Sequence, residues 1–476
     1  MLRLIVLAAV VLYGAIARSE DRTRDRDEAP KFRALTLEKA VSIALKQNPE
    51  IRKALHEIER TRGQVLEVRA QALPHVTANG SYSQQDPKLL QGSGSSSFSQ
   101  GSGASFSSQD KSWRITVEAR QLIYSGGQVK AAVKIAKLTE DASYYMLRET
   151  VTQVIANVRT QFSTVLLDRD LITVSEESIQ LLTDQLKDQQ NRFAAGTVPR
   201  FNVLQAEVAL ANARPDLIRA RNNHLIARLQ LAKTLAFDAN QSVDVIGDLR
   251  ANPTEVDLSA ALTSARQHRA VLKAQRNTIA SEEQQISVAA AGYKPQLSAD
   301  VGYEVTSSRN STDLSKTANG WYLGVTGTWN IFDGLQTKGR VDQARARLAS
   351  ATVSLADSIQ QVELEVQKAY AAVNQARELI ASQTKVVEQS DEALRLAKER
   401  LSAGAGTQLD VLSAQVARTQ SRTTQKQALA DYNVAIAEFD RATGAETIYD
   451  TTVAELGGLR TGPSTRGERA PLITRE

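Results

Sequence analysis

Apolar residues recur at every seventh position in a long stretch of this chain that contains neither glycine nor proline. The stretch covers residues 128–195 and lies between Gly127 and Gly196. A single helix of that length would span roughly 100 Å at ~1.5 Å per residue. A strict seven-residue repeat is typical of a narrow coiled-coil seam, not of the broad buried face of a globular helix. The repeat consists of Val151, Val158, Val165, Ile172, Ile179, Leu186 and Phe193.

A second copy of this pattern follows at an offset of 208 residues, so that Val151 corresponds to Ile359. It again occupies a stretch without glycine or proline, between Gly339 and Gly404. The chain is therefore predicted to be an internally duplicated, mainly helical protein with one long strut in each copy. The second series consists of Ile359, Val366, Val373, Ile380, Val387, Leu394 and Leu401.

Shorter helical patterns precede and follow each strut. One covers about residues 36–72, with a break predicted at Pro49, and a related pattern begins near Val256 at an offset of 221. A return helix is predicted over about residues 200–237. Together the segments at 36–72 and 200–237 are about as long as the first strut, so stacked end to end they could form a second strut beside it.

The period changes from helical to two after Pro74 and after Pro295, which predicts four strands of about ten residues each. Strands of this length can cross a membrane at a tilt. Trp113, Trp321 and Trp329 are assigned to these strands, as aromatic anchors at the membrane interface. The outward apolar positions are Val76, Ala78, Gly80 and Tyr82, then Ile115, Val117 and Ala119, then Leu297, Ala299, Val301, Tyr303 and Val305, and finally Leu323, Val325 and Ile331.

Two readings of these hairpins are possible. A soluble hairpin would bury the apolar face under another segment, but no segment suited to cover it is left in the chain. A membrane hairpin would turn that face to lipid. Because four strands cannot close a membrane barrel, two or three copies of the chain would have to supply the rest.

The composition and motifs of the chain argue against several classes of function. The net charge is +5 with both signs interspersed, which indicates solvated helix faces and gives no basic patch for nucleic acid. The absence of cysteine excludes disulfides, thiolate metal sites and a cysteine nucleophile. No phosphate-binding loop, nucleophile elbow or zinc-protease motif occurs, and the four histidines lack metal-ligand spacing. We therefore expect no enzyme activity, no cofactor and no metal site.

The ends of the chain suggest export. A basic start, a short apolar run and the site Ala15-Ile16-Ala17 predict a signal peptide at residues 1–17, followed by a flexible charged leader at 18–34.

The rest of the chain divides into two repeats. We expect a first repeat at 35–244 with its hairpin at 73–124, a linker at 245–255, and a second repeat at 256–444 with its hairpin at 295–332. Residues 445–476 should form a disordered tail. The two repeats differ by 13 residues between Pro74 and Trp113, which predicts an insertion in the Ser/Gly-rich loop there.

Each strut ends at a matching tip. Residues 192–214 and 400–422 align at the offset of 208, and Gly196 and Gly404 are suited to the left-handed turn that ends a helix. The tip pattern G-x-x-x-x-[LF]-[DN]-V-L and the turns IYSGGQ and IFDGLQ resemble the TolC family of bacterial outer-membrane efflux proteins. The resemblance implies a homotrimer whose twelve strands form one outer-membrane β-barrel, continued by an α-helical barrel across the periplasm.

The same resemblance implies roles for tip residues. Asp410 matches an acidic position that forms a constriction ring, with Asn202 and Ser413 at related positions, neither of them acidic. A periplasmic adaptor protein, coupled to an inner-membrane pump or ABC transporter, would dock at the tip. Arg192 and Arg400 flank the tip and could pair with acidic groups or favour the helix end. The candidate docking residues are Gly196, Thr197, Val198, Gly404, Ala405 and Gly406.

The Asp410 position also has a local explanation, because Thr407 and Asp410 have the spacing of a helix capping box. The leading functional hypothesis is a passive outer-membrane channel for efflux or type I secretion. The alternative is a structural coiled-coil protein of the periplasm or cell surface that has no pore.

Overall fold

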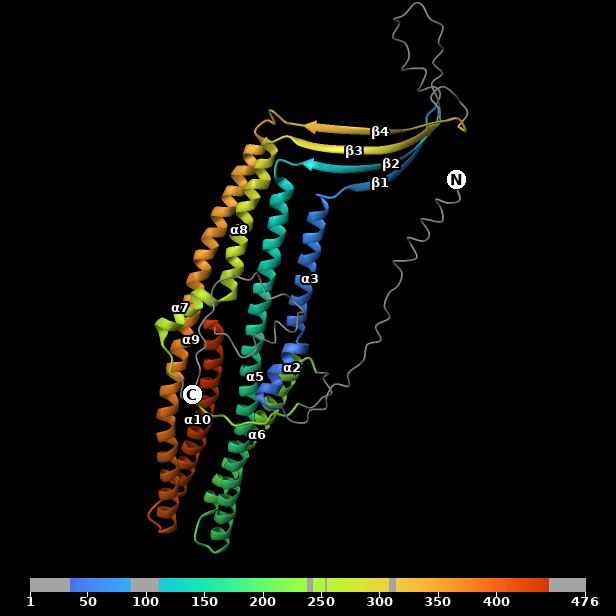
Figure 1. The fold of residues 1–476 in the computed structure, drawn as a ribbon. Coiled ribbons are helices and arrows are strands. Elements are labelled where there is room, and N and C mark those ends of the chain that lie inside the picture. Colours follow the sequence, from blue (N-terminus) through green and yellow to red (C-terminus); the bar gives the residue numbers. More distant parts are fainter. Residues whose placement is uncertain (1–34, 87–110, 238–242, 253–254, 308–313, 445–476) are drawn as a thin grey trace, which may run out of the picture.

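The computed structural model describes residues 35–86, 111–237, 243–252, 255–307 and 314–444, and Figure 1 shows an elongated molecule with one sheet above a long row of helices. The predicted signal peptide, leader, tail and loop insertion lie outside the described residues. The first half contains α2 (Leu37–Gln47), α3 (Pro49–Ala70), β1 (His75–Gln84), β2 (Lys111–Tyr124), α5 (Gln128–Ala194) and α6 (Arg200–Thr234). The second half contains α7 (Leu258–His268), α8 (Ala270–Ala290), η1 (Ala291–Tyr293), β3 (Gln296–Ser307), β4 (Thr317–Thr328), α9 (Gln336–Ser402) and α10 (Gln408–Thr443).

The two predicted struts are α5 and α9, and each is an uninterrupted helix of 67 residues. α9 begins at Gln336 and continues through Gly339, so it starts before the glycine-free stretch that indicated it. Asp333 accounts for this: its carboxylate accepts a hydrogen bond from the backbone N–H of Thr337 at 2.8 Å and so caps the first turn. A capped first turn tolerates a glycine that would otherwise weaken the helix.

The seven-residue seam is the packing face of both struts. Val158, Val165, Val366 and Val373 are fully buried. Near the tip the residues of the seam are less buried, and Phe193 is 45% exposed. The heptad pattern therefore predicts the buried side of each strut along most of its length.

Shorter helices stack along each strut, as predicted. α3, α2 and α6 pack along α5, and α8, α7 and α10 pack along α9 (Figure 1). α6 ends at Thr234, slightly before the predicted limit, and it continues through Pro215. The predicted break at Pro49 is confirmed, and the second repeat breaks at Arg269 without a proline.

The four strands form one antiparallel sheet in the order β1-β2-β3-β4. The register places apolar residues opposite one another, with Ala78 across from Val117 and Val301 across from Leu323. Strand side chains alternate between faces, so this register gathers the predicted apolar positions on one face and the charged positions on the other. The expectation that all three tryptophans lie in strands is wrong, because β4 ends at Thr328 and Trp329 follows it.

The helices form an open row. In the half nearer the sheet, α3 packs on α5, α5 on α8 and α8 on α9; in the other half, α6 packs on α5, α5 on α10 and α10 on α9 (Figure 1). The row therefore has two free edges, one formed by α3 and α6 and the other by α9. The sheet is open in the same sense, with β1 and β4 at its edges.

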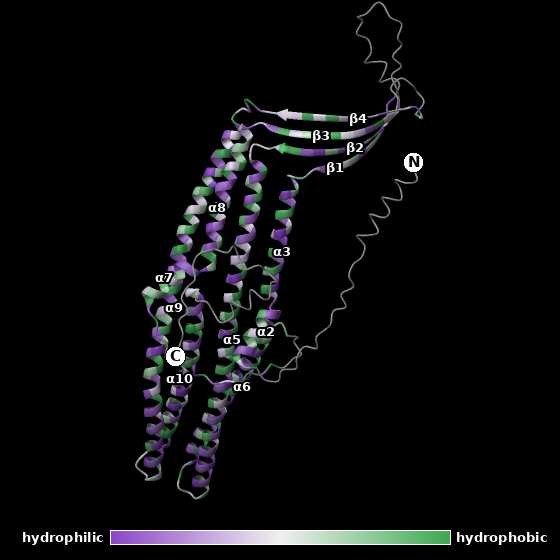
Figure 2. Cartoon of the chain, viewed as in Figure 1, coloured by the Kyte–Doolittle hydropathy of each residue, from purple (hydrophilic) through white to green (hydrophobic). Residues whose placement is uncertain are grey.

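The largest apolar core lies midway along the molecule, where α2, α3 and α6 meet α5. The segment at 243–249 joins this core through Val243, Val245 and Leu249. Apolar and polar residues otherwise alternate around the helices along their whole length (Figure 2). None of the helices in the described ranges combines the length with the hydrophobicity of a transmembrane helix.

Candidate functional site at the helical tip

Both struts end in the same backbone motif. Gly196 and Gly404 have φ angles of 72° and 71°, in the left-handed region that glycine adopts without a steric cost. The N–H of Thr197 donates to the carbonyl of Arg192 at 2.9 Å, and the N–H of Ala405 donates to that of Arg400 at 2.8 Å. These bonds form a Schellman motif, which satisfies the last carbonyls of a helix. The predicted left-handed turn at the end of each strut is confirmed at both tips.

Asp410 lies in the first turn of α10 and forms a complete capping box with Thr407. Its Oδ2 accepts from the Thr407 N–H at 2.8 Å, and the Thr407 hydroxyl accepts from the Asp410 N–H at 3.2 Å. The hydrogen bonds from the backbone and the hydroxyl of Thr407 lower the pKa of this exposed carboxyl group. The local explanation of Asp410 therefore holds, and the group is a fixed anion at neutral pH.

Asn202 lies in the first turn of α6, and Ser413 follows Asp410 by three residues in α10. The Gln408 side chain donates to the carbonyl of Asn202 at 3.2 Å, which ties the two tips of one chain together. Ser413 is exposed, and its hydroxyl donates to the carbonyl of Leu409 at 2.7 Å. The starts of α6 and α10 are thus joined by a contact between residues more than 200 positions apart in the sequence.

The two arginines that flank the tips make different contacts. Arg192 pairs with Asp188 at 2.9 Å, one turn earlier in α5. Arg400 donates to the carbonyl of Ala405 at 3.4 Å, in the tip itself. One arginine therefore has the predicted acidic partner, whereas the other supports the helix end.

The candidate docking residues sit on the surface of the tips. Gly196, Thr197, Gly404 and Ala405 are exposed, and Val198 and Gly406 are partly covered. A Cβ atom added to Gly196 or Gly404 would meet no heavy atom within 4 Å, so the space around these two glycines is open.

Sequence reasoning missed a cluster of ion pairs further up the struts. Arg422 of α10 pairs with Glu177 of α5 at 2.7 Å and with Asp391 of α9 at 3.2 Å. Arg418, one turn away in α10, hydrogen-bonds to Asp391 through Nε. The spacing of four between the arginines indicated a shared helix face, but the identity of the partners depends on how three helices pack. The cluster ties the two struts together near the tips.

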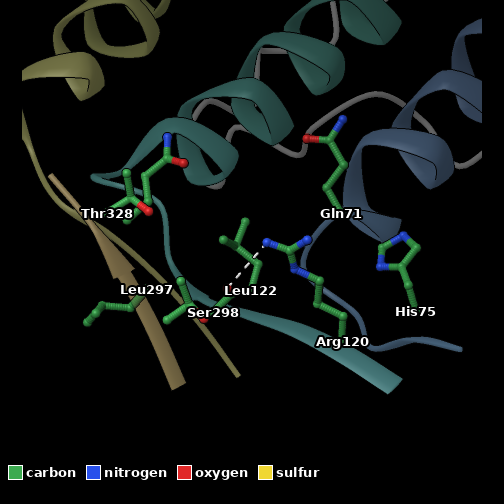
Figure 3. A pocket seen from close by; sticks show the side chains of 9 residues that line it. Gln71, His75, Arg120, Leu122, Leu297, Ser298 and Thr328 are labelled. Atoms are coloured by element: carbon green, nitrogen blue, oxygen red, sulfur yellow. Dashed lines mark hydrogen bonds between the residues drawn. The ribbon is translucent and has the colours of Figure 1, made fainter. Parts of the chain in front are cut away.

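Polar contacts also organise the charged face of the sheet. Arg114 pairs with Glu304 at 3.3 Å, and the hydroxyl of Tyr322 donates to Glu118 at 3.0 Å. Among the described residues, Arg120, further toward the helices, has one side-chain partner, Ser298, at 3.5 Å (Figure 3). Charged side chains on this face therefore have ionic or hydrogen-bonding partners at the end distant from the helices. Near the helices they have fewer such partners.

The tryptophans lie at both ends of the sheet. The indole N–H of Trp113 donates to the carbonyl of Leu314 at 3.0 Å, in the connection between β3 and β4. The indole of Trp329 donates to the carbonyl of Tyr293 at 3.1 Å, at the helical end. Trp321 is 77% exposed. Aromatic residues at both ends of an apolar strand face are typical of membrane strands.

The family model described as outer membrane efflux protein matches residues 40–236 and 261–445. The chain belongs to this family. Its members are outer-membrane channels that extend into the periplasm, which confirms the predicted fold class, the TolC-family resemblance and the predicted location. This family member is thus related to transport proteins, not to enzymes.

Individual relatives agree with this assignment. The family member is 24% identical over 405 residues to the toluene efflux pump outer membrane protein TtgC of Pseudomonas putida, covering 81% of this chain and 78% of TtgC. It is 25% identical to outer membrane protein OprJ of Pseudomonas aeruginosa, covering 80% and 78% of the two chains. The fold resembles the crystal structure of the CmeC outer membrane channel of Campylobacter jejuni with a TM-score of 0.74, 18% identity, and coverage of 88% and 89%.

Proposed function

We propose that three copies of this chain close into one channel, which serves as the exit duct of a tripartite efflux pump or a type I secretion system. The observation that carries this proposal is the pair of free edges on both layers of the chain. In the part of the chain that the structure describes, β1 and β4 each pair on one side only, and the helix row ends at α3 and α6 on one side and at α9 on the other. Unpaired strand edges are a liability that ring closure removes.

The edge formed by α6 is apolar as well as free. Exposed apolar side chains follow one another along this helix at steps of three, four, seven or ten residues, all of which are sums of the three and four that alternate in a coiled-coil seam. They are Phe201, Leu204, Val208, Ile218, Leu225 and Leu229. A seam of this kind fits the α9 edge of the next copy, in a head-to-tail contact that closes into a ring.

The number of copies follows from the size of the pore. Two copies would supply eight strands, and side chains fill the interior of an eight-stranded barrel. Three copies supply twelve strands and leave an open lumen. The apolar face of the sheet, with Val117, Val301 and Leu323, would then contact outer-membrane lipid, while the charged face with Arg114 and Glu118 would line water.

We place the gate at the tip. In a trimer, three Asp410 carboxylates would surround one axis, with Asn202 and Ser413 beside them. The Thr407 N–H engages Oδ2, which leaves Oδ1 without a capping role. Three fixed anions at a constriction attract cations and repel anions. Because Asn202 and Ser413 are uncharged, the ring would carry three charges and no more.

The exposed tip glycines and their neighbours are the proposed contact with a periplasmic adaptor. No group in the described chain is suited to couple an energy source to transport, so energy would come from an inner-membrane pump or ABC transporter. The cargo would be selected by that partner. The channel itself would act as a passive conduit.

The particle mass in detergent tests the assembly. We expect three chains per particle for the unmodified protein. Ile218→Glu combined with Leu225→Glu places charges on the α6 seam and should yield single chains with unchanged helix content. Asn223→Glu, on an exposed position outside the seam, is the matched control and should leave three chains.

A monomeric unmodified protein, or a seam variant that still forms three chains, would contradict the proposed ring. A structural coiled-coil protein without a pore would form no ion-conducting channel. Ion conductance of the purified protein in planar bilayers therefore separates the two functions.

A further inference from the structure

Two pockets adjoin each other where the sheet meets the helices. The first has a volume of about 370 Å³ and lies between the end of α3 and the strands; Arg120, His75 and Ser298 contribute to its lining (Figure 3). The second has a volume of about 390 Å³ and is lined by the ends of α5, α8 and α9, with Arg340 and Arg347 on one wall. Gln296 lines both pockets, so the two pockets meet at this residue.

The lining of these pockets is basic. Among the described residues, no Asp or Glu contributes to either pocket, whereas three arginines and one histidine do. Arg120, Arg340 and Arg347 form no ion pair with any described residue. Arg114 differs, because it lies on the same face of β2 as Arg120 and is paired with Glu304 at 3.3 Å. The unpaired positive charge is thus concentrated at the helical end of the sheet.

One carboxylate, that of Asp300, lies close enough to Arg120 that it could neutralise its charge. Asp300 is directly opposite Arg120 in the β2–β3 ladder. It forms no ion pair with Arg120, and its Oδ2 lies over Gly324, 2.8 Å from where a Cβ of that residue would be. Gly324 therefore leaves room for Asp300 to turn toward β4, and the guanidinium of Arg120 stays open to a ligand.

The other lining groups suit an organic anion. Gln71, Thr326 and Thr328 contribute amide and hydroxyl donors to the first pocket, and Leu122 contributes an apolar surface. Arginine binds carboxylate, sulfonate and phosphate groups through two parallel N–H donors. We propose that this region is a binding site for amphipathic organic anions, with Arg120 holding the charged group and Leu122 contacting the apolar part.

The site rests on the proposed channel, because Arg120, Ser298 and Gln296 lie on the charged face of the sheet, which would line the lumen. In a closed ring the pockets of all copies would form a basic collar between the helical and strand parts of the duct. A solute leaving the helices would meet the collar before it entered the strands. The same anionic chemistry occurs in phospholipid head groups, so the experiment must separate a soluble anion from a lipid.

Block of single-channel current in planar bilayers tests the site. The probe is octanesulfonate, and octyltrimethylammonium is the control of opposite charge. We expect octanesulfonate to block the unmodified channel, and Arg120→Gln to weaken the block about fivefold, as befits an exposed charge contact. Arg114→Gln, the matched control on the same face, should leave the block unchanged. Arg347→Gln probes the second pocket and should also weaken the block.

Equal block by both probes, or equal weakening by Arg114→Gln and Arg120→Gln, would overturn the anion site while leaving the channel intact. A channel that does not conduct at all would overturn the proposed function itself. If phospholipid copurifies with the unmodified protein but not with Arg120→Gln, and the block is the same in both, the site binds lipid. This result would overturn the proposal that its ligand is a soluble anion. An unaltered trimer mass for each variant shows that the substitutions preserve the fold.

Discussion

Asn48 and Arg269 occupy equivalent positions in the two repeats, at the offset of 221, and each binds the carboxyl end of a return helix. The side-chain amide of Asn48 donates to the carbonyl of Thr234 at 2.8 Å, at the end of α6. The guanidinium of Arg269 donates to the carbonyl of Arg441 at 2.8 Å, near the end of α10. Both side chains are buried at the break between two short helices. The break between the two short helices is therefore joined to the return helix in both repeats, by an amide in the first and by a guanidinium in the second. We call this contact the joint.

Removing these clamps should weaken the protein by different amounts. Asn48 also caps α3, accepting from the Glu50 N–H at 2.8 Å, so Asn48→Ala should cost about 1 to 3 kcal/mol. Arg269→Met removes the ion pairs with Glu149 at 3.2 Å and Glu365 at 3.1 Å, so that these partly buried carboxylates keep Arg441 as their only arginine partner among the described residues. This substitution should cost about 3 kcal/mol. Denaturant unfolding followed by helical circular dichroism measures both effects.

A solvent-exposed ion pair is the control for that comparison. Arg266 pairs with Glu363 at 2.8 Å, and its side chain is 58% exposed. Arg266→Gln should therefore change the free energy of unfolding by less than about 1 kcal/mol. If Arg269→Met is as mild as Arg266→Gln, the buried pairs do not hold the joint.

Charge and capping at Asp410 can be separated by substitution. Asp410→Asn keeps an oxygen that can accept from the Thr407 N–H but removes the charge, so it should lower cation selectivity without loosening α10. Thr407→Val removes the hydroxyl partner of the Asp410 N–H and should cost about 1 kcal/mol of stability, with selectivity unchanged. Reversal potentials in asymmetric salt report selectivity. An unchanged potential for Asp410→Asn would leave Asp410 with a capping role only.

The tip glycines should resist substitution for conformational reasons alone. Gly404→Ala places a Cβ in open space but at a φ of 71°, so it should destabilise the tip by roughly 1 to 2 kcal/mol. Gly63→Ala is the matched control, because Gly63 lies within α3 with equally open space and should gain roughly 0.5 to 1 kcal/mol. Hydrogen exchange of the tip amides measures the local effect. Equal exchange in both variants would show that the left-handed turn is not required.

The ion-pair cluster near the tips should make their stability depend on acid. Burial by itself raises the pKa of Asp391, but hydrogen bonds from Arg418 and Arg422 outweigh it and hold the pKa below its ordinary value of 3.8. A carboxyl group with a lowered pKa stabilises the fold above its ordinary pKa and loses that contribution as the pH falls through the lowered value. We expect protease resistance of the tips to be constant from neutral pH to about pH 5 and to fall below about pH 4.

Asp391→Asn is the control for the acid effect. It should reduce protease resistance at neutral pH and flatten the decline below about pH 4, because the group that titrates is gone. A decline as steep as that of the unmodified protein would assign the acid sensitivity to other carboxylates.

Local patterns predicted most of the elements because each depends on neighbours in the sequence. The seam through Val158 and Val366 repeats every seven residues, and a helix turns each member toward the same side regardless of its partner. Gly196 and Gly404 end their helices because their backbone can adopt a positive φ, which is a property of the residue itself. Alternation along the strands likewise decides which residues share a face. Trp329 was misplaced because alternation does not mark where a strand ends.

Contacts between distant residues were decided only by the tertiary structure. The sequence shows arginines at 269, 418 and 422 but not their partners, which lie on other helices and depend on how the struts pack side by side. The difference between Arg114, which is paired, and Arg120, which is not, follows from the register of β2 against β3 and from the space over Gly324. Periodicity determines which side of an element is buried, whereas the partner across the interface depends on the position of a second element far away in the chain.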